Sequence, residues 1–202
     1  MTKEYHRKIQ EKNHWNHPKM WCVLLFTCFV IGICAGAAVC AKTSEETNQS
    51  MYSYLNEFTQ GAKDHFDKPA VLRNSIGNHS RIFLALFVSA LFPAGVALAG
   101  GAVFLKGFTS GFTIAAFIKY YGAKGILLSA ASLPVNLIFV PAMILFATVA
   151  VKMALERARK EKKMLLFFVL FSLLLFAIFC VCSFLEAYVT TTLMKFFAGK
   201  LV

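Results

Sequence analysis

Long apolar runs, separated by short polar segments, dominate the chain. The runs lie near residues 21–41, 82–105, 107–121, 125–151 and 164–185. A helix rises about 1.5 Å per residue, so roughly 20 residues cross the roughly 30 Å of bilayer hydrocarbon. The pattern therefore predicts an all-α, polytopic membrane bundle with about five transmembrane helices. The 107–121 run is short, and both a tilted span and a re-entrant segment fit it.

Composition agrees with this fold class. Hydrophobic residues make up 58% of the 202 residues and charged residues only 15%, which is too apolar for an ordinary soluble domain. We expect a basic tail at 1–19 and a single membrane domain at 20–202, with the lipid bilayer as its surroundings. The sequence leaves open whether the protein forms a homo-oligomer.

The distribution of basic residues predicts the orientation. Lysine and arginine are concentrated in the 1–19 tail and in the linker at 152–163. The positive-inside rule assigns both segments to the cytoplasm. With five spans, the N-terminus is then cytoplasmic and the C-terminus extracytoplasmic in a multi-pass protein of the cell membrane. The same arrangement puts Lys106 at a cytoplasmic turn between the second and third spans.

The 42–81 segment is the predicted outer loop, and it contains an amphipathic pattern. Its apolar positions recur at helical spacing: Met51, Tyr54, Leu55, Phe58, Ala62 and Phe66. Asn56 and other polar residues fill the opposite face, and we expect Pro69 and Gly77 to end the helix. The loop is too short to bury a core of its own. Its apolar face is expected on the bilayer, on the spans or on a partner protein.

Pro134, Asn136 and Pro141 interrupt an apolar run that is otherwise long enough to span a membrane. A proline inside a helix removes a backbone hydrogen bond, and hydrocarbon cannot satisfy the freed carbonyl or the Asn136 amide. Two interpretations remain open. The three residues mark either a helix contact that serves packing or a polar cavity.

Pairs of glycines four residues apart predict close helix approach. Gly32 and Gly36 form one pair in the first run, and Gly107 and Gly111 form another at the start of the third. Because small residues are dense between Pro93 and Gly111, we expect the second and third spans to pack as a tight pair.

Nothing in the sequence predicts catalysis. The chain has no glycine-rich phosphate loop, no nucleophile beside a base and no paired carboxylates within the spans, and Glu186 is placed at an outer helix end. The six cysteines form no metal-ligand pattern. We therefore expect no catalytic residue, no metal, no cofactor and no enzymatic activity. A basic tail alone does not make nucleic acid an expected partner.

Several motifs resemble the stage II sporulation protein M family. They are the stretch from Leu105 to Thr113 (LKGFTSGFT), Pro134-Val135-Asn136 with Pro141, and Tyr54-Leu55-Asn56-Glu57-Phe58 in the outer loop. The order of tail, anchor span, outer loop, glycine-rich pair, Pro-x-Asn span, linker and last span is also similar. The family often has Pro-Gln-Asn where this chain has Pro134-Val135-Asn136, so a role that needs the glutamine amide does not carry over.

The resemblance implies a component of the engulfment machinery of sporulating bacteria. In that family the membrane protein is a non-enzymatic scaffold that recruits and localises two peptidoglycan hydrolases, a lytic transglycosylase and an amidase/endopeptidase. The alternative function is a transport or permease-like subunit that uses the broken helix at Pro134, Asn136 and Pro141. Transport normally requires more polar groups around a shared cavity than the sequence displays.

Overall fold

The computed structural model describes residues 18–44, 49–53, 55, 67–155 and 162–199. These residues are helical or lie in turns, and they contain no β-strand. The all-α class is therefore confirmed. The helices are α2 (Pro18–Ala41), α4 (Lys68–Ser89), α5 (Gly95–Tyr121), α6 (Ala123–Ala130), α7 (Leu133–Leu155), α8 (Lys162–Leu185) and α9 (Thr191–Gly199), with a π-helical turn at Glu186–Thr190 between the last two.

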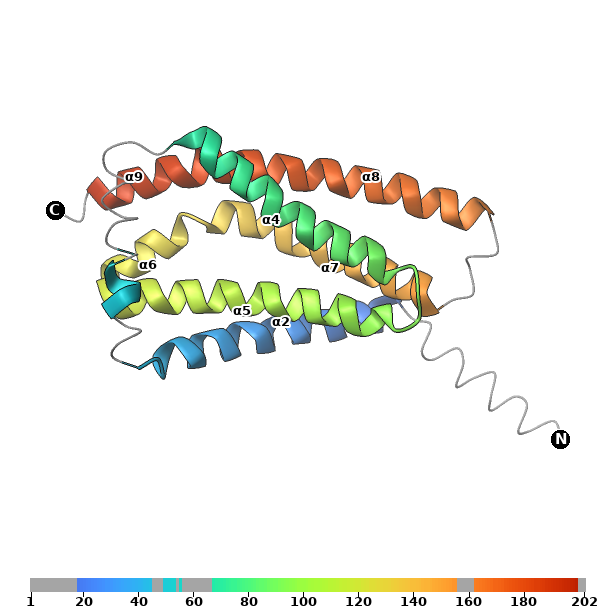
Figure 1. Cartoon of the computed structure of the whole chain (residues 1–202), viewed down its shortest axis with the longest axis horizontal. Helices are drawn as coiled ribbons and strands as arrows, with labels where there is room; N and C mark the ends of the chain where they lie inside the picture. The colour runs from blue at the N-terminus through green and yellow to red at the C-terminus, as the bar shows by residue number, and fades with distance from the viewer. Residues whose placement is uncertain (1–17, 45–48, 54, 56–66, 156–161, 200–202) are drawn as a thin grey trace.

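The long helices α2, α4, α5, α7 and α8 lie side by side, and the short α6 and α9 lie together at one end (Figure 1). Four segments are long and apolar enough to cross a membrane: Pro18–Ala41, Gly95–Tyr121, Leu133–Leu155 and Leu165–Phe197. α4 has the length but carries Arg73, His79 and Arg81, and it does not meet that criterion. These features make the protein a polytopic helical membrane bundle.

The predicted boundaries of the second and third spans are wrong. The 82–105 run is divided by a turn at 90–94, so that its first part ends α4 and its second part begins α5. Pro93 disfavours a continuous helix there. A side chain at Gly95 would collide with the carbonyl oxygen of Ser89, so the turn requires a glycine. The 107–121 run is the second half of α5, neither a separate span nor a re-entrant segment.

Helix α4 also changes the interpretation of the outer loop. Asp67 caps the helix through its side chain, which accepts a hydrogen bond from the Ala70 amide at 3.4 Å, and Pro69 lies in the first turn. Proline is favoured at a helix start because its missing N–H would have no partner there. Pro69 therefore begins α4, and Gly77 lies inside it. The expectation that these two residues end a helix is wrong.

The two glycine pairs join α2 to α5. A Cβ at Gly32 or Gly36 would strike carbonyl oxygens of α5, at Phe104 and Phe108, and a Cβ at Gly107 or Gly111 would strike those of α2, at Phe29 and Ile33. The partner numbers rise together, so the two helices run parallel, as Figure 1 also shows. The expected tight pair of the second and third spans is thus replaced by a contact between α2 and α5.

Two apolar clusters hold the bundle. The larger one surrounds α7, where Phe139, Met143, Phe146 and Ala150 are fully buried between the other long helices. The smaller one lies where α6 and α9 meet the ends of α2 and α5. Its buried members are Cys40, Leu55, Ala116, Phe117, Leu128, Ala131 and Met194.

Candidate functional site

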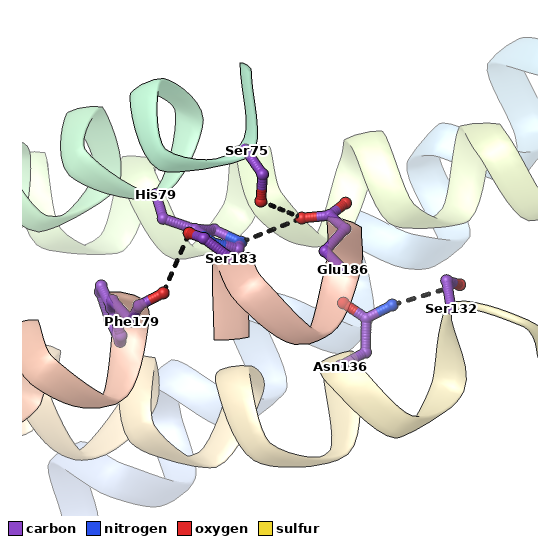
Figure 2. A network of polar contacts seen from close by, with 7 residues as sticks. All are labelled: Ser75, His79, Ser132, Asn136, Phe179, Ser183 and Glu186. Carbon is purple, nitrogen blue, oxygen red and sulfur yellow. Dashed lines mark hydrogen bonds and ion pairs between the residues drawn. The ribbon is translucent and has the colours of Figure 1, made fainter. Parts of the chain in front are cut away.

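Polar side chains of α4 and of the α8 end meet inside the bundle. Ser75 and His79 lie one turn apart on α4, and Ser183 and Glu186 face them from α8 and the π-helical turn (Figure 2). Ser75 Oγ donates to Glu186 Oε2 at 2.5 Å, and His79 Nε2 lies 3.7 Å from the same oxygen. His79 Nδ1 lies 2.7 Å from Ser183 Oγ. We call these four residues the α4–α8 polar cluster.

The cluster constrains the protons on His79. Ser183 Oγ also lies 3.0 Å from the Phe179 carbonyl oxygen, to which its hydroxyl donates. If the hydroxyl proton points there, Nδ1–H donates to Ser183, and the ring is either the neutral Nδ1–H tautomer or an imidazolium that pairs with Glu186. If it points to Nδ1, a neutral ring donates its Nε2–H toward Glu186 instead. Only 3% of the His79 side chain is exposed, whereas 42% of Glu186 is, so the carboxylate connects a buried imidazole to the protein surface.

Lys106 lies beside this cluster, in the middle of α5. It follows Gly95 by 11 residues and precedes Tyr121 by 15. Its Nζ is 5.0 Å from the centre of the Phe139 ring, and His79 stacks on the same ring at 4.3 Å between centroids. The ammonium also interacts electrostatically with Glu186 and His79. The prediction of Lys106 at a turn is wrong, because Lys106 lies inside α5 and the turn before that helix is at 90–94.

The π-helical turn places Glu186 at the edge of the cluster. Such turns add one residue to a helix and are frequent at functional sites. In the same turn, Tyr188 contacts the Lys68 ammonium, which lies 5.4 Å from the ring centre. The Thr190 hydroxyl is buried and has no hydrogen-bond partner in the part of the chain that the structure describes. The turn thus brings the α8 end against the first turns of α4.

Pro134, Asn136 and Pro141 do not form a site together. Pro134 lies in the first turn of α7, where it interrupts no hydrogen bond of the helix, whereas Pro141 lies inside the helix and is exposed. Asn136 is half-buried, and its Nδ2 donates to Ser132 Oγ at 3.5 Å, within the same segment. In Figure 2 no dashed line joins this pair to Glu186. The bond is local, so whether Asn136 serves packing between helices or a polar cavity stays a prediction.

Of the predicted outer-loop residues, Tyr54, Asn56 and Phe58 lie outside the described residues. Leu55 is described and buried, in the smaller apolar cluster with Phe117 and Leu128. Leu55 therefore packs against the spans, which is one of the three locations expected for the apolar face of the outer-loop helix.

The α4–α8 polar cluster offers a carboxylate, an imidazole and a nearby ammonium. These groups can hold or exchange protons and can bind one another across helices. Among the described residues, no group of three or more His, Cys, Asp or Glu side chains is suited to a metal ion. The arrangement provides electrostatic coupling between α4, α5 and α8.

Ser75, His79 and Ser183 were missed as site residues by the sequence interpretation, and Glu186 was placed at an outer end. A usable signal existed. Ionisable residues at membrane depth are costly and usually functional. Ser75, His79, Phe83 and Leu86 recur at helical spacing after an Asp-x-Pro helix start, which predicts a helix with a polar site on its packed face.

Comparison with known proteins adds a family. The model of the family described as stage II sporulation protein M matches residues 25–191, which is most of the chain. Neither the comparison with curated proteins nor that with solved structures gives a match. The match spans α2 to the start of α9 and so contains the glycine contact and the polar cluster. The chain therefore belongs to the stage II sporulation protein M family, a family of sporulation-related membrane proteins.

Proposed function

We propose that this protein is a non-enzymatic membrane scaffold that recruits and localises peptidoglycan hydrolases during engulfment in sporulating bacteria. The partners in this proposal are a lytic transglycosylase and an amidase/endopeptidase. Family membership supports the sporulation role. The orientation remains the one predicted from charge, with a cytoplasmic N-terminus and an extracytoplasmic C-terminus.

The observation that carries the proposal is the smaller apolar cluster. It joins Leu55, from the segment after α2, to the end of α5, to α6 and to α9. Tyr52 adds an aromatic contact there, with its ring centroid 5.8 Å from that of Tyr120. By the predicted orientation this end is extracytoplasmic. This buried cluster also includes Cys40 of α2, so it fixes five parts of the chain at one end of the bundle. A rigid end suits a docking role, because binding residues on rigid elements keep their geometry.

The test replaces the apolar face of the outer-loop helix. A Tyr54→Ser, Leu55→Ser, Phe58→Ser variant, tagged and expressed in sporulating cells, is expected to lose co-purification of both hydrolases while its membrane level stays normal. The matched control is Leu137→Ser, Leu173→Ser, Leu174→Ser, which alters exposed residues of α7 and α8. Equal recovery of the hydrolases with both variants, at normal protein level, contradicts the scaffold proposal.

The second candidate function is a transport or permease-like subunit, and one observation favours it. The described bundle contains His79, Glu186 and Lys106 in one polar region, which is more than the Asn136 amide and nearby Ser and Thr residues that the sequence suggested. Proton or solute flux in reconstituted vesicles separates the two functions. Transport predicts flux in the wild type that falls in Asn136→Leu or Glu186→Gln. Absence of flux in the wild type eliminates it.

A further inference from the structure

One face of α4 is polar although the helix packs against the candidate membrane spans α5, α7 and α8. Its exposed polar side chains are Arg73, Asn74, Asn78 and Arg81, and the half-buried Gly77 lies between them. The opposite face carries Ser75, His79 and Leu86, which are buried in the bundle. We call the exposed positions the α4 outer stripe. α4 is therefore polar on both sides at its middle.

Contacts on the buried face fix the depth of the stripe. The His79 ring lies 4.3 Å from that of Phe139, and the Phe83 ring lies 5.1 Å from that of Phe146, measured between centroids. Arg81 is between His79 and Phe83 in the sequence, so it lies level with the 139–146 part of α7, the middle of a candidate membrane span. Hydrocarbon does not satisfy a guanidinium at that depth.

No described group of this chain satisfies the stripe. Arg73, Asn74, Asn78 and Arg81 make no side-chain hydrogen bond or ion pair with the described residues. The carboxylates in the described ranges are those of Asp67 and Glu186, and both are engaged. Asp67 caps α4, and Glu186 binds Ser75 and His79. No described carboxylate is thus available to Arg73 or Arg81.

Gly77 leaves room for a close approach on this face of α4, as Gly100 and Gly101 do on α5. At Gly32, Gly36, Gly107 and Gly111 a Cβ would collide with the facing backbone, whereas at Gly77 no described atom lies within 4 Å. Glycine in a helix interior is unfavourable unless a close approach requires it. The backbone of another helix can therefore come close to α4 at Gly77. Arg73 and Arg81 lie four residues to either side of this position.

We propose that the α4 outer stripe is an intramembrane docking surface for a transmembrane helix of another protein, one that carries a carboxylate near the middle of its span. Such a helix supplies the counter-charge of Arg73 and Arg81 and packs its backbone against Gly77. A second copy of this chain fits poorly, because rotation about the membrane normal brings arginine against arginine. Lipid phosphates lie at the interface, above the level of Arg81.

This proposal rests on the scaffold function proposed above. It adds the chemical groups through which the scaffold would bind a membrane-anchored partner. The test does not need the partner. The full chain, with a donor dye on a terminal tag, is reconstituted in phosphatidylcholine vesicles. The probe is an acceptor-labelled Leu/Ala helix of about 23 residues with one central Glu, and matched probes carry Gln or Leu at that position.

Energy transfer to the Glu probe is expected to show binding about tenfold tighter than to the Leu probe, as for a buried interhelical polar contact. An Arg73→Gln, Arg81→Gln variant is expected to bind both probes equally weakly. Lys195→Gln, which removes an exposed lysine of α9, is expected to bind like the wild type. Circular dichroism establishes that the variants remain helical. Arg81→Glu tested with a central Lys probe is expected to restore binding.

Three outcomes overturn the docking surface. They are equal binding of the Glu and Leu probes to the wild type, Glu-probe binding that survives Arg73→Gln, Arg81→Gln, and self-association of the chain that this variant abolishes. The last outcome would assign the stripe to a second copy. If the docking surface fails while co-purification of the hydrolases still depends on the outer loop, the scaffold proposal stands without it. Loss of that dependence alone overturns the scaffold proposal.

Discussion

The α2–α5 contact and the α4–α8 contact hold the same bundle by different means. Between α2 and α5, glycines bring backbone against backbone, and Cys28 Sγ and Lys119 Nζ reach carbonyls of the facing helix at 3.6 Å and 3.1 Å. Between α4 and α8, side chains bind through Ser75, His79, Ser183 and Glu186. The first contact depends on shape and the second on charge and hydrogen bonding. Substitutions should therefore affect the two contacts in different ways.

The largest effect is expected at the glycine contact. A Cβ at Gly111 would collide with the Ile33 carbonyl oxygen and lie 2.7 Å from Ile33 Cα, so Gly111→Val must separate the two backbones. We expect it to lower the free energy of unfolding by about 3 kcal/mol or more. Unfolding by sodium dodecyl sulfate, followed by circular dichroism, measures the change.

Gly101→Ala is the matched control for that contact. No described atom lies within 4 Å of a Cβ at Gly101, although it is on the same helix. Relief of the glycine helix penalty should make this variant equal to the wild type or more stable by up to about 1 kcal/mol. If both variants have the same stability, close packing is not what joins α2 to α5.

A smaller loss is expected from the polar contact. Ser183→Ala removes the oxygen that lies 2.7 Å from His79 Nδ1, so a buried ring nitrogen loses its partner. We expect a loss of about 1–2 kcal/mol in the same unfolding experiment. Ser172→Ala is the control, because Ser172 is buried on α8 but bonds only the Phe168 carbonyl of its own helix. Equal losses would show that the contact between helices adds nothing.

A double-mutant cycle sharpens the electrostatic part of the comparison. Lys106→Met removes a positive charge that acts on Glu186, and Glu186→Gln removes a negative charge that acts on Lys106. The double variant should therefore be more stable than the sum of the two single losses predicts, by about 1 kcal/mol. Denaturant unfolding of all four proteins measures this coupling. Additivity of the single losses would place the two charges in separate environments.

The smallest effect is a gain. Thr190 has a buried hydroxyl without a partner among the described residues, at the end of the π-helical turn. Thr190→Val keeps the shape and removes the unsatisfied group, so stability should stay the same or rise by up to about 1 kcal/mol. A loss above that size in thermal unfolding would mean that the hydroxyl binds something in the bilayer environment.

The sequence predicted the elements defined by apolar composition. The runs at 21–41, 125–151 and 164–185 correspond to α2, to α6 with α7 and to α8, and the glycine pairs are contact points as expected. Hydropathy does not reveal the first part of α4, because Arg73, His79 and Arg81 give it the profile of a loop, whereas the last part belongs to the 82–105 run. Its helix signals were present at Asp67 and Pro69, but Pro69 was read as an end.

The partners of the site residues were beyond local pattern analysis. His79 and Ser183 are 104 positions apart in the chain, and Ser75 and Glu186 are 111 apart. No periodicity connects such residues, so only the packing of α4 against α8 brings them together. Lys106 was misplaced for a related reason. A lysine between two apolar runs is typical of a turn, unless a carboxylate from a distant helix lies beside it.

The separation of α4 from α8 has a consequence for biosynthesis. At about 5–20 residues per second, the ribosome adds the 104 residues between His79 and Ser183 in about 5–20 s. Throughout that interval α4 is already made, and its polar face lacks the α8 groups that bind it. α4 can pack on α5 and α7 before that time, but its polar contacts form only when α8 arrives, so the last long helix completes the bundle. A chain truncated before Ser183 would leave Ser75 and His79 of α4 without the partners that they have in the full bundle.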